Sequence, residues 1–183
     1  MDTFLSPIEK PSSLIMKMVF YFTRKQFGKV LSPLTVFSAR LPNAFGMFYG
    51  KAYQLDKKMT LPVETAMLIR QQVSRINICS FCMDSGRFYF IKRKLNEAKF
   101  DALDHYQSSP MFTEAEKVVL DYATELTKYK KVNADIFGRL KGFYSEREIC
   151  EIVFLIASEH LSNITNIGLN IHSDMLCDIS KKK

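Results

Sequence analysis

The sequence predicts an all-α domain of about seven or eight helices joined by short connections. Apolar side chains recur at helical spacing through most of the chain, and no stretch alternates apolar and polar residues long enough to form a convincing strand. Two capping boxes, Thr113 with Glu116 and Ser145 with Glu148, mark helix starts in the last third. At 183 residues, the chain is long enough to bury a sizeable core in one such domain.

The N-terminal part is expected to comprise an extended lead-in with Pro7 and Pro11 and then an amphipathic helix over residues 13–30. One side of this helix is apolar, with Leu14, Ile15, Met18, Val19 and Phe22. Basic residues fall on the other side. Such a helix packs more often on its own domain or on a neighbouring subunit than on a membrane, and its apolar run is too short to span a bilayer. We therefore divide the chain into this N-terminal lead-in and helix, residues 1–34, and a helical domain, residues 35–183.

Two prolines open the next predicted helices. Pro42 precedes an aromatic stripe that we expect to be core and that runs through Phe45, Phe48, Tyr49 and Ala52. Pro62 opens a helix that carries Glu64 in its first turn, where the macrodipole favours an acid, and that ends at Cys79. Residues 83–97 are again compatible with a helix.

The last third contains three predicted helices, which begin after Thr113, Asn133 and Ser145. We expect the second to bury Ile136, Phe137, Leu140 and Phe143. We expect the third to turn an apolar stripe inward, formed by Ile149, Ile152, Val153, Ile156, His160, Ile164, Ile167 and Ile171.

The net charge of +7 comes from basic residues that are scattered along the sequence. The sequence contains no recognition helix rich in Arg and Asn, no aromatic RNA-binding signature and no zinc-finger spacing, so we expect no nucleic-acid partner.

Cysteine usage predicts a reducing compartment. The four cysteines are Cys79, Cys82, Cys150 and Cys177, and the sequence shows no recognisable secretory leader, so we expect a cytoplasmic protein with mostly free thiols. Cys150, outside the close pair, is predicted to be a small core residue.

The Cys79-Ser80-Phe81-Cys82 motif at the junction of two helices makes redox and metal chemistry the first hypotheses. A structural zinc site takes four ligands, usually in two close pairs, whereas the remaining Cys and His residues are scattered singly, so we expect no metal and no other cofactor. Redox chemistry needs one thiolate that attacks and one thiol that resolves, which this spacing provides at a helix start. Two cysteines buried by chance remain the alternative.

The motifs together resemble the alkylhydroperoxidase D-like / carboxymuconolactone decarboxylase-like superfamily over roughly residues 35–172. The resemblance rests on the aromatic helix after Pro42, the approach from Glu64 through Ile69-Arg70 and residues 73–78 to the cysteines, and the helix starts at residues 112–116 and 143–149. It implies an all-helical homo-oligomer. In the redox-active branch it implies a peroxidase in which Cys82 attacks and Cys79 resolves.

Two positions depart from this pattern. The redox-active branch has a histidine where this chain has Gly86 and a glutamate where it has Met67. A proton relay would therefore be built differently, and the candidates are three. Glu64 lies one turn before Met67, Asp84 lies two residues after Cys82, and His160 lies on the predicted inward stripe of the long helix. The decarboxylase branch needs an acid–base pair rather than cysteines, so the retained pair argues against it.

The sequence therefore predicts a thiol-dependent peroxidase or disulfide reductase. Its substrate would be a hydroperoxide or a disulfide, and a thiol reductant protein would regenerate it. The alternative is a non-enzymatic redox sensor or an oligomeric binding module in which the cysteine pair is structural.

Overall fold

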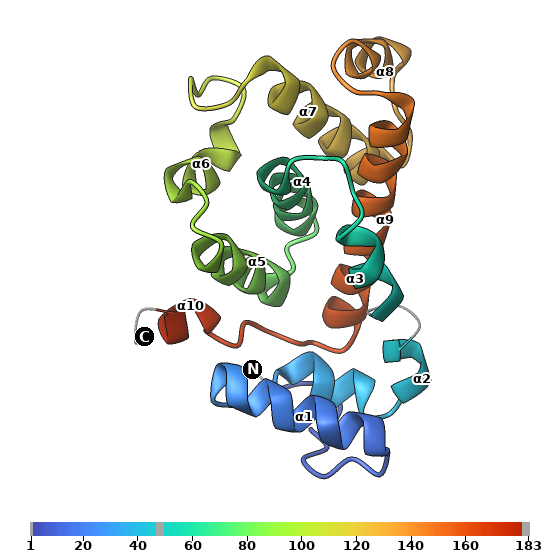
Figure 1. Cartoon of the computed structure of the whole chain (residues 1–183), viewed down its shortest axis with the longest axis vertical. Coiled ribbons are helices and arrows are strands. Elements are labelled where there is room, and N and C mark those ends of the chain that lie inside the picture. The colour runs from blue at the N-terminus through green and yellow to red at the C-terminus, as the bar shows by residue number, and fades with distance from the viewer. Residues whose placement is uncertain (1, 47–49, 181–183) are drawn as a thin grey trace.

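The computed structural model describes residues 2–46 and 50–180, and this part of the chain contains helices and no strand (Figure 1). The elements are α1 (Leu14–Phe27), the π-helical turn η1 (Leu34–Ser38), α2 (Pro42–Phe45), α3 (Lys51–Asp56), α4 (Val63–Ile76), α5 (Ser80–Lys92), α6 (Glu97–Asp101), the 3-10 turn η3 (Ala102–His105), α7 (Glu114–Tyr129), α8 (Ala134–Lys141), α9 (Glu146–Gly168) and α10 (Leu176–Ser180). The predicted all-α class is confirmed. The predicted aromatic stripe after Pro42 falls partly on Phe48 and Tyr49, which lie outside the described residues.

Helix α4 is the central element, and α5, α6, α7 and α9 surround it in Figure 1. One side of α4 contributes Ile69 and Val73 to a core shared with α7 and α9. Another side contributes Leu68 to a second cluster with Phe90 of α5 and Phe100 of α6. Because α4 is enclosed on several sides, the cysteine motif that follows its C-terminal end lies in the interior of the protein.

The predicted helix starts are confirmed. Thr113 and Ser145 each accept a hydrogen bond from the third backbone N–H of the helix that follows, and Glu116 and Glu148 complete the two capping boxes. Asn133 caps α8 through its side chain. These local signals operate within a few residues, which is why they could be read without the fold.

The turn from α4 to α5 is a Schellman motif. The Cys79 N–H donates to the Ser74 carbonyl and the Ile78 N–H donates to the Arg75 carbonyl, both at 3.0 Å. Ile78 occupies the left-handed position with φ of 57°, where glycine is usual. A β-branched residue in this region costs on the order of 1–3 kcal/mol. The surrounding fold therefore holds the residue directly before Cys79 in a strained conformation.

The N-terminal segment packs along the C-terminal one. In Figure 1, α1 lies below α5 and α10, and the segment that links α9 to α10 passes between them. Phe27 of α1 packs with Phe88 of α5 and Leu176 of α10. The buried side of α1 carries Met16 and Phe20. The side that the sequence pattern marked as apolar is largely exposed, including Leu14, Ile15, Met18 and Phe22.

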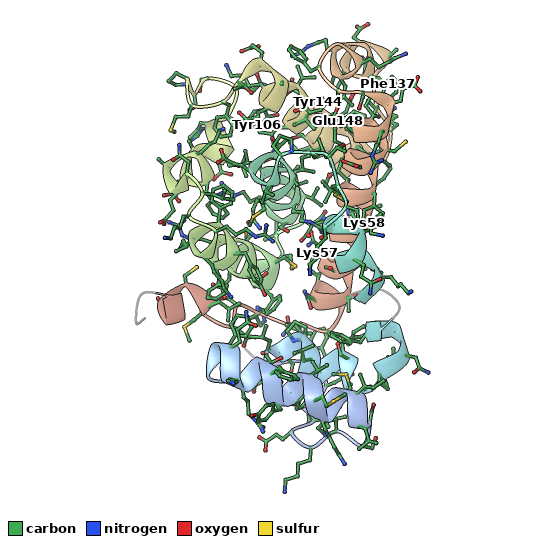
Figure 2. All side chains as sticks on the ribbon, in the orientation of Figure 1. Lys57, Lys58, Tyr106, Phe137, Tyr144 and Glu148 are labelled. Carbon is green, nitrogen blue, oxygen red and sulfur yellow. A yellow bond between two sulfur atoms is a disulfide. The ribbon has the colours of Figure 1, made fainter. Side chains whose placement is uncertain are left out.

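Three expectations about burial are wrong in part. Leu140 is buried as predicted, but Phe137 and Phe143 are about half exposed, at 40% and 52%. The ring centroids of Phe137 and Tyr122 are 6.4 Å apart, and Phe137 lies at α8, near the upper end of the molecule in Figure 2. Cys150 is exposed rather than buried.

Helix α9 also departs from its predicted orientation after its first turns. Ile149, Ile152 and Ile156 are buried as expected, but three other positions of the predicted stripe, Val153, Ile164 and Ile167, are exposed. The buried positions in this half are instead Leu155, Glu159, Asn163 and Asn166. The helix turns a polar face toward α4 and the cysteine motif, where the Glu159 carboxylate accepts from Ser74, the Asn163 amide donates to Ser74 and the Asn166 amide donates to Cys82.

No described helix has the combination of length and apolar character that a transmembrane span requires.

Candidate functional site

Cys79 and Cys82 form a disulfide across the start of α5, with Cα atoms 5.3 Å apart. Cys79 is the N-cap residue, and its Sγ accepts a hydrogen bond from the Cys82 N–H at 3.3 Å. Both cysteines are buried, at 1% and 5% exposure. Cys82 lies in the first turn of α5, where the helix dipole and unpaired N–H groups favour a thiolate once the disulfide is reduced.

A cavity of about 380 Å³ lies beside Cys82. Its wall is mainly apolar, and the apolar residues include Phe27 of α1, Leu34 of η1, Phe45 of α2, and Phe81 and Tyr89 of α5. Cys82 lines this cavity, and Cys79 is not among its lining residues. A small molecule in the cavity would therefore meet the second cysteine first.

Helix α9 contributes Glu159, Ser162 and Asn166 to the polar part of the lining, alongside hydroxyl and amide side chains of α1, η1 and α5. The Glu159 carboxylate is held by α4: Oε1 accepts from the Ser74 hydroxyl at 2.7 Å, and Oε2 accepts from Arg70 Nη1 at 3.2 Å. Arg70 also binds both carboxylate oxygens of Asp56 in α3 at 3.0 Å. Glu159 is thus a well-positioned buried acid that faces the same cavity as Cys82.

Two buried amides contact Cys82. Asn166 Nδ2 donates to Cys82 Sγ at 3.4 Å, and Gln71 Nε2 donates to the Cys82 carbonyl oxygen at 3.3 Å. Asn166 and Gln71 are each 3% exposed. The side-chain carbonyl oxygens of both residues accept no hydrogen bond from any described residue. Each amide therefore has one satisfied end and one unpaired acceptor.

Gln71 explains why glycine stands at position 86. A Cβ added to Gly86 would lie 1.5 Å from Gln71 Nε2 and 2.4 Å from its Cδ, well inside contact distance. The space that a histidine side chain would enter is therefore filled by an amide from α4. Met67, one turn before Gln71, packs against the core cluster of Leu68, Phe90 and Phe100. The two departures from the family pattern lie on contacting helices, α4 and α5.

Glu64 and Asp84 have other partners. Glu64 accepts a hydrogen bond from Lys99 Nζ at 2.8 Å, and Lys99 also pairs with buried Glu116 at 2.6 Å. Burial opposes the charged form of Lys99, but hydrogen bonds to Glu116 and Glu64 outweigh it and raise the Lys99 pKa. Asp84 accepts from the Ser173 hydroxyl at 2.8 Å and from the Leu176 N–H at 2.9 Å. Asp84 thus anchors the C-terminal segment on α5.

His160 lies close to the motif through Asn77. Its Nδ1 is 3.1 Å from Asn77 Nδ2, and Asn77 Nδ2 also donates to Asn163 Oδ1 at 2.9 Å. Because an amide nitrogen only donates, His160 Nδ1 acts as the acceptor. Burial lowers the His160 pKa, and the positive charge of Lys130 lowers it further, so the imidazole is neutral at pH 7.

Sequence reasoning missed Glu159, Asn166 and Gln71. A signal was present for the first two, because residues 159, 163 and 166 repeat at helical spacing on one face of the long helix. All three are polar, whereas the apolar stripe of the same helix predicted that the opposite face would be buried. No local signal marked Gln71, whose role depends on the close approach of α4 to α5.

Comparisons with known proteins give two descriptions of this chain. A family model described as DNA polymerase III, delta subunit, matches residues 64–172, and by sequence this match places the chain in the family so described. The protein YnjA of Escherichia coli K12 is 26% identical over 183 residues, covering 98% of both chains. YdfG of Bacillus subtilis is 24% identical over 115 residues, covering 62% of this chain and 78% of YdfG.

The solved structures describe the fold. The debrominase Bmp8 in complex with 2,3,4-tribromopyrrole has a TM-score of 0.83 and 21% identity, covering 100% of this chain and 97% of Bmp8. An alkylhydroperoxidase AhpD core protein from Ralstonia eutropha JMP134 has a TM-score of 0.76 and 17% identity, covering 91% and 89%. The residues that match the polymerase model therefore fold here as the helical bundle found in AhpD-like proteins.

Proposed function

We propose that this chain, which has the fold of alkylhydroperoxidase D-like proteins, is a thiol-dependent oxidoreductase that reduces hydroperoxides through Cys82 and Cys79. One observation carries the proposal: Cys82 lies at the start of a helix, lines an apolar cavity and is bonded to its neighbouring cysteine. The proposal rests on this site and not on the description of the polymerase family model. The residues that match that model form the helical bundle around the cysteine pair.

The reaction proceeds in two steps. The Cys82 thiolate attacks the terminal oxygen of a hydroperoxide, ROOH; an S–O bond forms, the O–O bond breaks, and the departing RO⁻ takes a proton to become an alcohol. The Cys79 thiol then attacks the Cys82 sulfenic acid, closing the disulfide and releasing water. An external dithiol returns the pair to its reduced state. In sum, two thiols and ROOH give a disulfide, ROH and water.

Glu159 is our preferred proton carrier in place of Glu64, Asp84 and His160. Its carboxylate lines the same cavity as Cys82, whereas Glu64, Asp84 and His160 are not among the residues that line it. Glu159 can accept the proton of the Cys82 thiol and return it to RO⁻ through water in the cavity.

Replacing Glu159 with glutamine should lower kcat/KM for a hydroperoxide by about 100-fold or more, because an amide cannot exchange the proton. The substitution keeps the acceptor for Ser74 and leaves Arg70 its two bonds to Asp56, and circular dichroism checks that the variant is folded. Glu114→Gln, which removes an exposed carboxylate on α7, is the matched control and should leave kcat/KM unchanged. Steady-state turnover between pH 5 and 9 gives kcat/KM for both variants. Equal profiles for Glu159→Gln and wild type would remove Glu159 from the mechanism.

A second candidate activity is reductive dehalogenation of an aromatic compound. It is favoured by the match to Bmp8, which covers the whole chain, including the N-terminal elements that line the cavity. The thiolate would attack the halogen, the ring carbon would take the bonding electrons and a proton, and Cys79 would displace halide to give the same disulfide. Two assays distinguish the candidate activities. Dehalogenation releases bromide from a brominated pyrrole, and peroxidase activity forms an alcohol from a hydroperoxide.

We also propose that the protein is a homo-oligomer, that a thiol reductant protein regenerates it and that it works in the cytoplasm. The half-exposed apolar residues Ile15, Met18, Ile164 and Ile167 support a homo-oligomer, since contact between subunits would cover them. Regeneration requires a thiol reductant protein, and the cytoplasm supplies such reductants. A redox sensor with a structural pair remains the alternative to an enzyme. We expect no nucleic-acid partner.

The deciding experiment supplies the purified protein with cumene hydroperoxide and a small dithiol reductant and measures alcohol formation. In a Cys79→Ser background, the pH dependence of alkylation of Cys82 is measured in parallel. Turnover together with a thiol pKa clearly below about 8.5 supports catalysis. A pKa at or above that value with no turnover of hydroperoxide or brominated pyrrole would support the redox-sensor reading.

A further inference from the structure

Asn166 has the features of a substrate-binding residue rather than of core packing. It lines the cavity, its side chain is buried, and its amide reaches the reactive sulfur at 3.4 Å. Its Oδ1 accepts no hydrogen bond from a described residue. A buried unpaired carbonyl costs about 1–3 kcal/mol, so a position that served packing alone would be better filled by leucine, which has a similar shape.

The backbone holds this amide in place. Helix α9 ends in a Schellman motif, in which the Ile171 N–H donates to the Asn166 carbonyl at 2.9 Å and the Asn170 N–H donates to the Ile167 carbonyl at 3.0 Å. Asn170 takes the left-handed conformation that this motif requires, with φ of 54°. The amide is therefore positioned before any ligand arrives.

We propose, building on the proposed peroxidase function, that Asn166 positions both reactants of the first step. Its Nδ2 holds the Cys82 thiolate, and its Oδ1 accepts a hydrogen bond from the O–H of the hydroperoxide. Because these two atoms belong to one amide, the hydroxyl oxygen is brought beside the sulfur that attacks it. The S–O bond forms there, the O–O bond breaks, and RO⁻ departs toward the cavity and takes the proton carried by Glu159.

The charges that face Cys82 are few among the described residues. Glu159 of α9 shares its cavity and is paired with Arg70 of α4, and Asp84 lies two residues along α5. The lining residues from α1 and η1 are uncharged. His160 is neutral and contacts Asn77. With little competing charge, the Asn166 donor should have a measurable effect on the thiolate.

Two substitutions separate the two ends of the amide. Asn166→Leu removes both the donor and the acceptor, whereas Asn166→Asp keeps an acceptor oxygen and removes the donor. In a Cys79→Ser background, thiolate absorbance during a pH titration should show the Cys82 pKa rising by about one unit in both variants. Thr165→Val, at a partly exposed position on α9 that does not line the cavity, is the matched control and should leave this pKa unchanged. Circular dichroism establishes that each variant is folded.

The oxygen end is tested by comparing two oxidants in single-turnover reactions above the Cys82 pKa. Cumene hydroperoxide carries an O–H donor, whereas the aromatic disulfide dithiobis(nitrobenzoate) does not. Asn166→Leu should slow the hydroperoxide reaction about 100-fold and change the disulfide reaction much less. Asn166→Asp should lose less of the hydroperoxide rate than Asn166→Leu.

The outcomes separate the two proposals. A Cys82 pKa that is unchanged in Asn166→Leu and Asn166→Asp overturns the positioning role, whatever the peroxidase rate. Equal slowing with both oxidants overturns the assignment of Oδ1. A wild-type protein that is inert to hydroperoxides, with a Cys82 pKa that still depends on Asn166, overturns the peroxidase function and leaves the sulfur contact standing.

Discussion

Cys82→Ser is expected to abolish reduction of hydroperoxides, with a loss of at least about 1,000-fold in turnover. The cavity is lined by Cys82 and not by Cys79, so the remaining thiol has no direct access to a bound oxidant. A serine hydroxyl is a far weaker nucleophile at neutral pH and cannot form the disulfide. Alcohol formation under steady-state conditions with excess dithiol measures the loss.

Cys79→Ser should behave differently, because Cys82 can still attack once. This variant is expected to consume about one equivalent of hydroperoxide and to stop at the sulfenic acid, which a dimedone-type reagent traps. Cys150→Ser, which removes an exposed free thiol outside the cavity, should match wild type in both assays. Turnover that survives Cys82→Ser but not Cys79→Ser would reverse the assigned roles, and turnover that survives both would exclude the pair from catalysis.

Gly86→Ala is expected to lower the free energy of unfolding by about 1–3 kcal/mol, although alanine is the better helix former. The added methyl group would lie 1.5 Å from Gln71 Nε2, so the buried Gln71 side chain would have to leave its bond to the Cys82 carbonyl oxygen. Urea denaturation of the reduced protein measures the change. The same variant should also alter Cys82 reactivity, since Gln71 contacts this residue directly.

The sign of this effect should depend on Gln71. In a Gln71→Ala background the obstacle is gone, and Gly86→Ala should then stabilise α5 by up to about 1 kcal/mol through helix propensity. Gly138→Ala in α8 is the matched control, because nothing lies within 4 Å of its added Cβ, and it should stabilise in both backgrounds. If Gly86→Ala stabilised the wild-type protein as well, Gln71 would not be what requires glycine at position 86.

Local interactions explain which features could be predicted from the sequence. Thr113, Asn133 and Ser145 were correctly identified as helix caps because capping involves only the next few residues. The cysteine motif was located at the junction of two helices for the same reason, since Cys79 caps the helix that carries Cys82. The sequence did not predict the Schellman turn before this motif, because Ile78 occupies the left-handed position where a glycine would have indicated such a turn.

Which residues are buried could be determined only from the tertiary structure. The long helix 146–168 carries an apolar stripe and a polar face, and the usual preference for burying apolar groups pointed to the stripe. In the fold, Ile164 and Ile167 are exposed and Asn163 and Asn166 are buried. The side-chain N–H groups of these amides donate to Ser74 and Cys82, and neither partner is close to them in sequence.

The sequence by itself determined the helical class, the helix starts and the two sulfur atoms, because periodicity, capping and a three-residue spacing are all properties of short segments. Only the tertiary structure decided what surrounds those sulfurs. Gln71 contacts Cys82 from 11 positions away, and Asn166 from 84. Contacts over such separations depend on how α4, α5 and α9 pack, so the cavity and its polar residues emerge only when these helices are placed together.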